Sequence, residues 1–361
     1  MRLEAQRKGA RVGLATLVAA AAAMGVVACG SSSDDSSTSA SGGASTASAG
    51  SSTTASSSGG KKASIAAFIV DSANPYDTSL SKAIQAEAAK QGADVQVFAA
   101  ANDPQKQVGQ CDDALATQKY NVFLIKAVSG PPMMPCARQA IAKGDTVIAI
   151  DDPLGPEYTT KPQVDGVAAS VLSLPTTNGT ALAEMTNEAC ANANPCKVAY
   201  YYGPPAFVFA SQSRQSFLDT LKNKYPNLQV VDQASSNFDL GTAYTLTKSL
   251  LAKDPDVNVI TADSDQSASG SIKALKEAGK LGSVKVIGGG GSGVGADSIK
   301  AGDQFGTSAL YPQSLGTKGV DLGIKALNGQ PLGKTEFDVA YLSPLGPKIT
   351  KANVAQFKPQ W

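Results

Sequence analysis

Short apolar runs alternate with capped helical segments along most of this chain of 361 residues. Four apolar runs predict buried parallel strands at 64–70, 95–99, 122–125 and 147–150. Cap residues between them predict helices at 78–91, 104–119 and 135–143. Since strand–helix–strand crossovers are right-handed, this order predicts an α/β fold with an open, doubly wound parallel sheet.

The same alternation returns after a passage rich in Pro and Gly at 152–166. It predicts helices at 177–191, 211–224, 242–253 and 267–278, and strands at 197–202, 228–231, 257–261 and 284–287. A third segment, with helices at 296–301 and 314–327 and strands at 305–310 and 337–342, is too short for a domain. We therefore expect two α/β lobes that this segment completes, with a cleft between the carboxyl ends of their strands.

The first 28 residues are typical of an export signal. Four basic residues and one acidic residue occupy the first twelve positions, and positions 12–28 contain no charge. A membrane anchor helix is the alternative, because the apolar stretch is near the length that spans a bilayer. The sequence Val26-Val27-Ala28-Cys29 resembles a bacterial lipobox, which implies cleavage after residue 28 and lipidation of Cys29.

Residues 29–62 follow as a predicted tether. Positions 30–60 hold 14 Ser, 6 Gly, 5 Ala, 4 Thr and 2 Asp, without a branched aliphatic or aromatic side chain. Such a segment buries too little apolar surface to offset the entropy of ordering its backbone. We expect a disordered leash between the lipid and the folded lobes.

Histidine is absent from the sequence, and the formal net charge is +1. The first fact excludes Ser-His-Asp and Cys-His nucleophile pairs and histidine-ligated zinc or haem. The second gives no overall basic field, so we expect no nucleic-acid partner. Because residues 1–28 have a net charge of +3, the mature chain would have +1 − 3 = −2.

Four cysteines remain after Cys29: Cys111, Cys136, Cys190 and Cys196. An even number in an exported protein predicts disulfides, and three pairings are open. We favour Cys111 with Cys136 and Cys190 with Cys196, because each pair falls within one predicted lobe. No Cys-x-x-Cys spacing favours a metal site, so we predict no metal and no cofactor.

Several stretches are informative together: SIAAFIVDSANPYDTSLSKAIQAEAAKQ at 64–91, IAIDD at 148–152, NFD at 237–239, DPDVNVITADSDQSASGSIKALKEAG at 254–279 and GTKG at 316–319. In this order they resemble the ribose-type (type I) periplasmic solute-binding proteins of bacterial ABC importers, here in a lipoprotein form. The resemblance implies two lobes joined by three crossings. The first lobe would comprise 63–155 plus 291–330, and the second 166–290 plus 335–345.

The resemblance also implies a function outside the cytoplasm. A monomeric lipoprotein on the outer face of the cell membrane would capture a small solute of the sugar type between its lobes and deliver it to an ABC permease and ATPase. A ligand receptor that feeds a membrane sensor is an alternative. A glycosidase with two carboxylates is another, although Asp151 and Asp152 are sequence neighbours rather than a separated pair.

Five positions carry over from the family's ligand site. Asn74 and Tyr76 match a turn that hydrogen-bonds and stacks on the ligand, Asp151 matches a ligand-binding aspartate, and Phe238 matches an aromatic of the second lobe. Arg214 lies one position from an expected arginine. The alternatives are ordinary packing for the two aromatics and a turn role for Asp151.

Other positions depart from the family pattern. Asp152 replaces an arginine and Ser264 an asparagine, while Gly290 and Leu310 replace an aspartate and a glutamine. Lys126 stands where a neutral polar residue is usual. These changes remove partners for ligand hydroxyls, so we hypothesise a less hydroxylated ligand, aromatic or carboxylated, with Lys126 or Arg214 as its counter-ion. Ser264 remains a candidate contact.

Two features leave choices open. Phe207 or Phe209 could line the cleft, because both follow the turn-forming Gly203-Pro204-Pro205. The glycine-rich run at 288–295 contains G-x-G-x-x-G, but no acidic residue follows a second strand about 20 residues later. We favour a flexible crossing between the lobes over a dinucleotide site.

Overall fold

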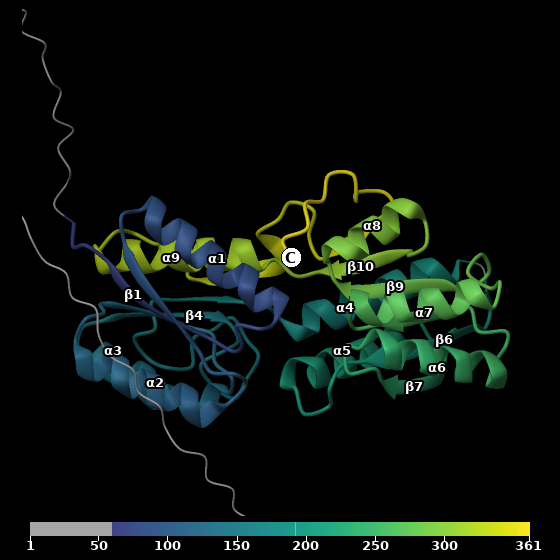
Figure 1. Cartoon of the computed structure of the whole chain (residues 1–361), viewed down its shortest axis with the longest axis horizontal. Coiled ribbons are helices and arrows are strands. Elements are labelled where there is room, and N and C mark those ends of the chain that lie inside the picture. Colours follow the sequence, from purple (N-terminus) through teal and green to yellow (C-terminus); the bar gives the residue numbers. More distant parts are fainter. Residues whose placement is uncertain (1–59, 192) are drawn as a thin grey trace, which may run out of the picture. The chain divides into compact units, whose positions relative to one another are not determined.

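Two six-stranded sheets organise the part of the chain that the structure describes, residues 60–191 and 193–361 of a computed structural model (Figure 1). These residues belong to one unit, Ser57–Trp361. The predicted signal peptide, the lipidation site at Cys29 and nearly all of the predicted tether lie outside the described residues. Among the described helices, none combines the length and apolar character needed to cross a bilayer.

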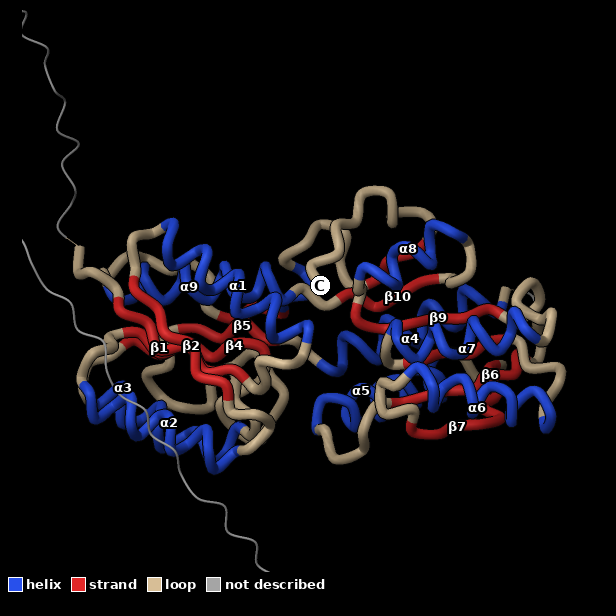
Figure 2. The backbone as a smooth tube through the Cα atoms, in the orientation of Figure 1, coloured by secondary structure: helices blue, strands red, loops and turns tan. Residues whose placement is uncertain are grey.

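The first sheet has the strand order β11-β5-β4-β3-β1-β2, with all strands parallel. Its strands are β1 (Ser64–Ile69), β2 (Asp94–Ala99), β3 (Val122–Ile125), β4 (Thr146–Asp151), β5 (Ala169–Leu172) and β11 (Glu336–Asp338). Helices α1 (Pro75–Lys90) and α9 (Pro312–Leu327) cover one face, and α2 (Pro104–Thr117) and α3 (Gly130–Ala142) cover the other (Figure 2). Both faces are therefore buried, which explains the continuous apolar strands.

The second sheet has the order β12-β10-β9-β8-β6-β7. Its strands are β6 (Cys196–Tyr202), β7 (Leu228–Ser235), β8 (Val259–Ala262), β9 (Lys285–Gly290), β10 (Gly306–Ala309) and the antiparallel β12 (Lys348–Thr350). Helices α4 (Pro175–Cys190) and α5 (Val208–Lys224) pack on one face, and α6 (Leu240–Lys253) and α7 (Asp265–Glu277) pack on the other. Helix α8 (Gly293–Ala301) lies beside α7, and a short 3-10 helix covers Val339–Tyr341. The predicted fold of two doubly wound lobes is confirmed.

The lobe boundaries predicted from the sequence were wrong in three places. Strands β5 and β11 belong to the first sheet, although 166–172 and 335–345 were predicted in the second lobe. Helix α8 and strand β10 belong to the second lobe, although 291–310 was predicted in the first. The chain passes between sheets after β5, between β10 and α9, and between β11 and β12. The glycine-rich run is therefore not a crossing, because it joins β9 to α8 within one lobe.

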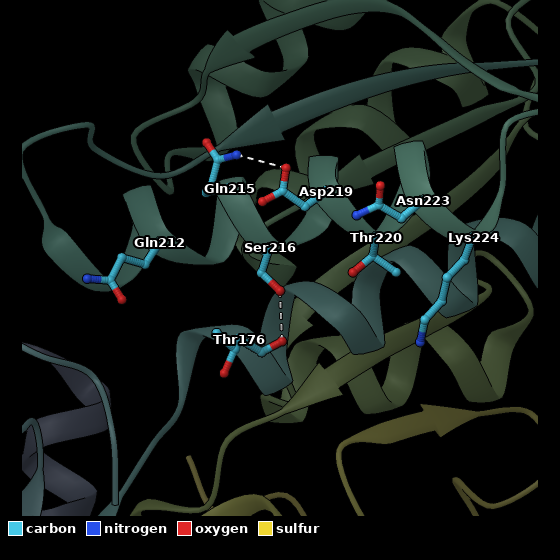
Figure 3. Close-up of a pocket in the computed structure, with 8 residues that line it drawn as sticks. All are labelled: Thr176, Gln212, Gln215, Ser216, Asp219, Thr220, Asn223 and Lys224. Atoms are coloured by element: carbon cyan, nitrogen blue, oxygen red, sulfur yellow. Dashed lines mark hydrogen bonds between the residues drawn. The ribbon is translucent and has the colours of Figure 1, made fainter.

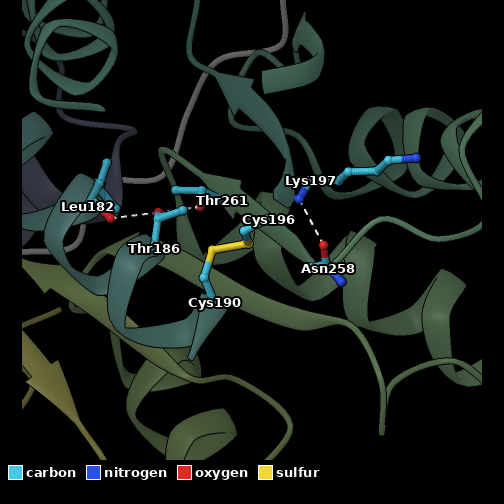
Figure 4. Close-up of a disulfide and its surroundings, with 7 residues drawn as sticks. All are labelled: Leu182, Thr186, Cys190, Cys196, Lys197, Asn258 and Thr261. Atoms are coloured by element: carbon cyan, nitrogen blue, oxygen red, sulfur yellow. Dashed lines mark hydrogen bonds between the residues drawn. A yellow bond between two sulfur atoms is a disulfide. The ribbon is translucent and has the colours of Figure 1, made fainter. Parts of the chain in front are cut away.

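Both favoured disulfides are present. Cys111–Cys136 joins α2 to α3 with a Cα–Cα distance of 6.2 Å, and Cys190–Cys196 joins the end of α4 to the start of β6 with 5.8 Å (Figure 4). Near the second bond, the hydroxyls of Thr186 and Thr261 are 2.7 Å apart. Each disulfide thus fastens neighbouring elements within a single lobe.

Candidate ligand-binding cleft

A cavity of about 420 Å³ lies where the carboxyl ends of strands from both sheets meet loop and helix residues. This volume falls within the range of about 300–1,000 Å³ that is usual for small-molecule sites. Open α/β sheets bind ligands at this edge. Polar and aromatic side chains of both lobes line the cavity: Asn74, Tyr76, Lys126, Asp151, Asp152, Ser173, Asn178, Phe207, Phe209, Ser213, Phe238, Asp263, Ser264, Gln266 and Trp361.

Lys126 forms the charged centre of the first-lobe wall. Its Nζ lies 2.5 Å from Asp77 Oδ1, 2.8 Å from Asp151 Oδ2 and 4.8 Å from the centre of the Tyr76 ring. All three charged side chains are at most 8% exposed. Burial lowers the pKa of Lys126, but Asp151 and Asp77 outweigh it and hold that pKa well above its usual value. The ammonium is therefore charged and already paired.

The start of α1 positions Asn74 and Tyr76. The Asn74 side chain accepts a hydrogen bond of 2.8 Å from the backbone N–H of Tyr76, and Pro75 supplies the first helical residue. The Tyr76 hydroxyl then donates to Asp151 Oδ1 at 2.8 Å, and the Ser173 hydroxyl donates to the same oxygen at 2.5 Å. Together with Lys126, these contacts give Asp151 three partners within the protein.

Asp152 is the next carboxylate on this wall. The Tyr158 hydroxyl donates to its Oδ1 at 2.6 Å, while no described residue donates to its Oδ2. Burial, and then the negative charge of Asp151, raise the pKa of Asp152 to about 7. Unlike Asp151, this side chain has an oxygen left for another partner.

Three phenylalanines form the second-lobe wall. The ring centres of Phe207 and Phe209 are 6.2 Å apart, and those of Phe207 and Phe238 are 6.5 Å apart. Phe238 has a left-handed backbone with φ 58°, which is unusual for a bulky residue. A Cβ at Gly203 would lie 2.2 Å from the Phe238 ring, so this glycine makes room for it. The open question about Phe207 and Phe209 is answered, since both line the cavity.

The loop from β8 into α7 adds polar groups to the second-lobe wall. Ser264 caps α7, because its Oγ accepts a hydrogen bond of 3.1 Å from the Ser267 N–H. Asp263 accepts hydrogen bonds from the Tyr200 hydroxyl and the Gly203 N–H, and burial raises the pKa of Asp263 to about 6. Ser264 thus lies at the cavity but is used structurally.

Arg214 is not brought to the cavity. Its guanidinium carbon lies 4.1 Å from the Tyr202 ring centre, and its Nη2 donates to Gln233 Oε1 at 2.7 Å. The preceding residue, Ser213, lines the cavity instead. One position turns a side chain about 100° around a helix, which explains the error of one residue. Of the two hypothesised counter-ions, Arg214 is thus not among the lining residues, while Lys126 lines the cavity and already pairs with two carboxylates.

The cavity includes residues that the sequence did not single out. Ser173 follows β5, a strand that was not predicted, while Asn178 and Gln266 lie in the first turns of α4 and α7. The one sequence feature that distinguishes Trp361 is that it is the single tryptophan of the chain. Within 60–191 and 193–361, no group of three or more His, Cys, Asp or Glu could hold a metal ion.

A second depression lies along α4 and α5, with a volume of about 460 Å³ (Figure 3). Its lining residues are polar: Thr176, Gln212, Gln215, Ser216, Asp219, Thr220, Asn223 and Lys224. Some are already bonded, as in the contact of 2.9 Å from Gln215 to Asp219. It lies on one lobe and its walls contain no aromatic side chain, so the interlobe cleft is the stronger candidate site.

Comparisons with known proteins agree with this architecture. A family model described as periplasmic binding protein domain matches residues 65–331. The ribose import binding protein RbsB of Bacillus subtilis is 28% identical over 264 residues, which cover 73% of this chain and 81% of that protein. The xylitol-binding protein of Mycolicibacterium smegmatis is 26% identical, with 70% and 67% of the two chains covered.

Solved structures show the same fold. A solute-binding protein of an ABC transporter from Actinobacillus succinogenes, with bound D-allose, has a TM-score of 0.69 and 21% identity over 82% of this chain and all of that one. One from Bacillus halodurans with bound myo-inositol has a TM-score of 0.68 and 20% identity over 84% and 99%. The chain belongs to the periplasmic binding protein family, whose members are sugar-type solute-binding proteins of ABC importers rather than enzymes.

Proposed function

We propose that this chain is a lipid-anchored receptor that captures a small, polyhydroxylated solute, neutral or positively charged, and delivers it to an ABC permease and ATPase. The observation that carries this proposal is the cavity of about 420 Å³ with walls from both lobes. A ligand that contacts both walls stabilises the closed arrangement over the open one. Anchoring through Cys29 is part of the proposal and rests on the lipobox resemblance.

The charges around the cavity favour such a ligand over a carboxylate. Lys126 is the only cationic residue among the described lining residues, and Asp77 and Asp151 already balance it. Asp152 and Asp263 add acceptors, and ionised they would repel an acid. Hydroxyl or ammonium donors fit these acceptors, whereas the carboxylated ligand hypothesised from the sequence would find no unpaired cation among these lining residues.

The aromatic side chains favour a compact ligand with an apolar face. Phe207, Phe209 and Phe238 line one side of the cavity, and Tyr76 lines the other. The C–H faces of a sugar or cyclitol pack on such rings while their hydroxyls meet polar groups. The relatives named for ribose and xylitol, and the structures with bound D-allose and myo-inositol, support this class.

A charge-matched panel tests the proposal on residues 60–361. D-glucose, D-glucosamine and D-glucuronate share one scaffold and differ in charge, while D-ribose, xylitol, D-allose and myo-inositol vary size. A bound ligand at 100 times its Kd should stabilise the protein by about 2.7 kcal/mol, which thermal shift detects and calorimetry confirms. Binding of glucuronate alone would contradict the ligand charge. No binding by the panel, and no small molecule retained in native mass spectrometry, would contradict the receptor function.

A further inference from the structure

Trp361 spans the cleft from one lobe to the other. Its indole N–H donates to the Gly290 carbonyl at 2.9 Å, and its backbone carbonyl accepts from the Gly293 N–H at 2.8 Å, so it is held by the second lobe. Its ring meets the Tyr76 ring of the first lobe edge-on, with centres 5.7 Å apart and an interplanar angle of 84°. Trp361 is thus an aromatic side chain in the cavity that touches both walls.

Gln360 fastens the same segment to the first lobe. Its Oε1 accepts from the backbone N–H groups of Gln313 and Ser314 at 2.8 and 3.0 Å, and its Nε2 donates to Ser314 Oγ at 2.7 Å. Its backbone carbonyl accepts from Ser79 Oγ and Gln313 Nε2. Tyr311, at the N-cap of α9, makes no side-chain cap bond. The side chain of Gln360, 46 residues after Ser314, instead accepts hydrogen bonds from backbone N–H groups at the start of that helix.

Gly290 leaves the space that the indole fills. This residue has φ +106°, and a Cβ built on it would lie 2.6 Å from the Trp361 ring. A side chain here would therefore push the indole out of its position. The Leu310 side chain lines the same cavity, and the Leu310 N–H donates to the Gly290 carbonyl at 3.1 Å. This corner of the site is apolar and shaped around the tryptophan.

We propose that Trp361 is a specificity-determining residue of the ligand site, held between the two lobes by the contacts of residues 360–361. The inference rests on the proposed function, because it assigns the indole as a wall for the captured solute. The ring adds a packing surface for a compact ligand and removes volume that a bulkier ligand would need. Replacing it with Ala weakens binding of compact ligands and admits larger ones.

Fluorescence and calorimetry test the wall on residues 60–361. Trp361 is the only tryptophan in the chain, so its emission reports on the cleft without a label. With D-ribose, xylitol, D-allose and myo-inositol as probes, binding should change this emission. Trp361→Ala should lower the affinity about tenfold, Trp361→Phe should retain most of it, and Lys358→Ala, on an exposed neighbour, should match the wild type. Unchanged emission on binding, or an affinity of Trp361→Ala within twofold of wild type, would overturn the assignment.

A ligand-free measurement separates this inference from the proposed function. Hydrogen exchange of the Gln313 and Ser314 amides should be at least about threefold faster in Gln360→Ala, because this substitution removes the side-chain oxygen that accepts from both amides. Gly290→Ala should shift the Trp361 emission toward that of a solvated indole. If no probe binds but these changes occur, the receptor function fails while the placement of the indole stands. Unchanged exchange and emission would overturn the placement itself.

Discussion

The two walls of the cleft are built on opposite principles. The first-lobe wall is a set of charges that satisfy one another, with Lys126 between Asp77 and Asp151 and both carboxylates almost fully buried. The second-lobe wall is aromatic, and its Phe207 is 42% exposed. Apart from Asp152, the first-lobe wall therefore has its charges paired without a ligand, whereas the second-lobe wall leaves apolar surface in water.

This difference divides the work of binding. A preformed polar wall needs little reordering when a ligand arrives, which lowers the entropy cost of binding. Exposed aromatic surface contributes favourable free energy only when a ligand covers it and removes it from water. We therefore expect changes in the first-lobe wall to affect folding stability first, and changes in the second-lobe wall to affect ligand affinity first.

The largest effect is expected for Lys126→Met, which leaves two buried carboxylates without their cation. Removing one member of a buried charge set typically costs about 3–5 kcal/mol of unfolding free energy. Chemical denaturation at pH 7.5 measures this loss. The loss should shrink at pH 5, because burial already raises the pKa of Asp77 and, without Lys126 to lower that pKa, Asp77 takes up a proton more readily there.

Lys276→Met is the matched control. Its ammonium pairs with Asp303 but is 54% exposed, and exposed pairs contribute no more than about 1 kcal/mol. If Lys126→Met costs no more than Lys276→Met, the first-lobe wall is not a preformed buried network.

Asp152→Asn is expected to have the next largest effect, and it tests the charge that the first-lobe wall does not balance. Burial raises the pKa of Asp152 to about 7, against 3.8 for an ordinary aspartate. The folded protein therefore holds this proton more tightly than the unfolded chain. The contribution of protonated Asp152 to the free energy of unfolding is complete below about pH 4 and is lost as pH rises through 7. From pH 5 to 8, ionisation of Asp152 should lower the free energy of unfolding by about 3 kcal/mol, and Asp152→Asn should remove this part of the slope.

Asp263→Asn provides the comparison from the second-lobe wall. Burial raises the pKa of Asp263 to about 6, so its share of the loss should occur about one pH unit lower. Denaturation at a series of pH values measures both profiles. Wild-type stability that stays flat or rises between pH 5 and 8 would contradict the raised pKa of Asp152.

The alternation of strands and helices was predictable because it follows local signals. Proline at the start of α2 and glycine after α1 and α3 mark helix ends, and long apolar runs mark central strands. The sheet to which β5 and β11 belong was not predictable. Both strands are short, β5 lies between loops, and β11 pairs with β5, which is distant in the sequence. Strands of three or four residues give little periodicity to detect.

The site was predictable where a residue follows directly from a strand end or a helix cap. Asn74, Tyr76, Asp151, Phe238, Lys126 and Ser264 all line the cavity, whereas Arg214 failed because a helix turns about 100° per residue. The pairing of Lys126 with its carboxylates was not predictable, because it depends on how β3 lies beside β1 and β4 in the folded sheet. Trp361 was missed because nothing local to residue 361 indicates that it folds back to Gly290.

The smallest effect, Phe238→Ala, sharpens the contrast between the walls. The Phe238 ring lies in the cavity, so its loss should weaken the best ligand of the panel about tenfold in calorimetry, which corresponds to about 1.4 kcal/mol. Stability should change much less than in Lys126→Met, because the ring is only partly buried. Leu240→Ala, 44% exposed and outside the cavity, should bind as the wild type does. Unchanged affinity in Phe238→Ala, or a stability loss equal to that of Lys126→Met, would show that the second-lobe wall is structural, and the division of work between the walls would not hold.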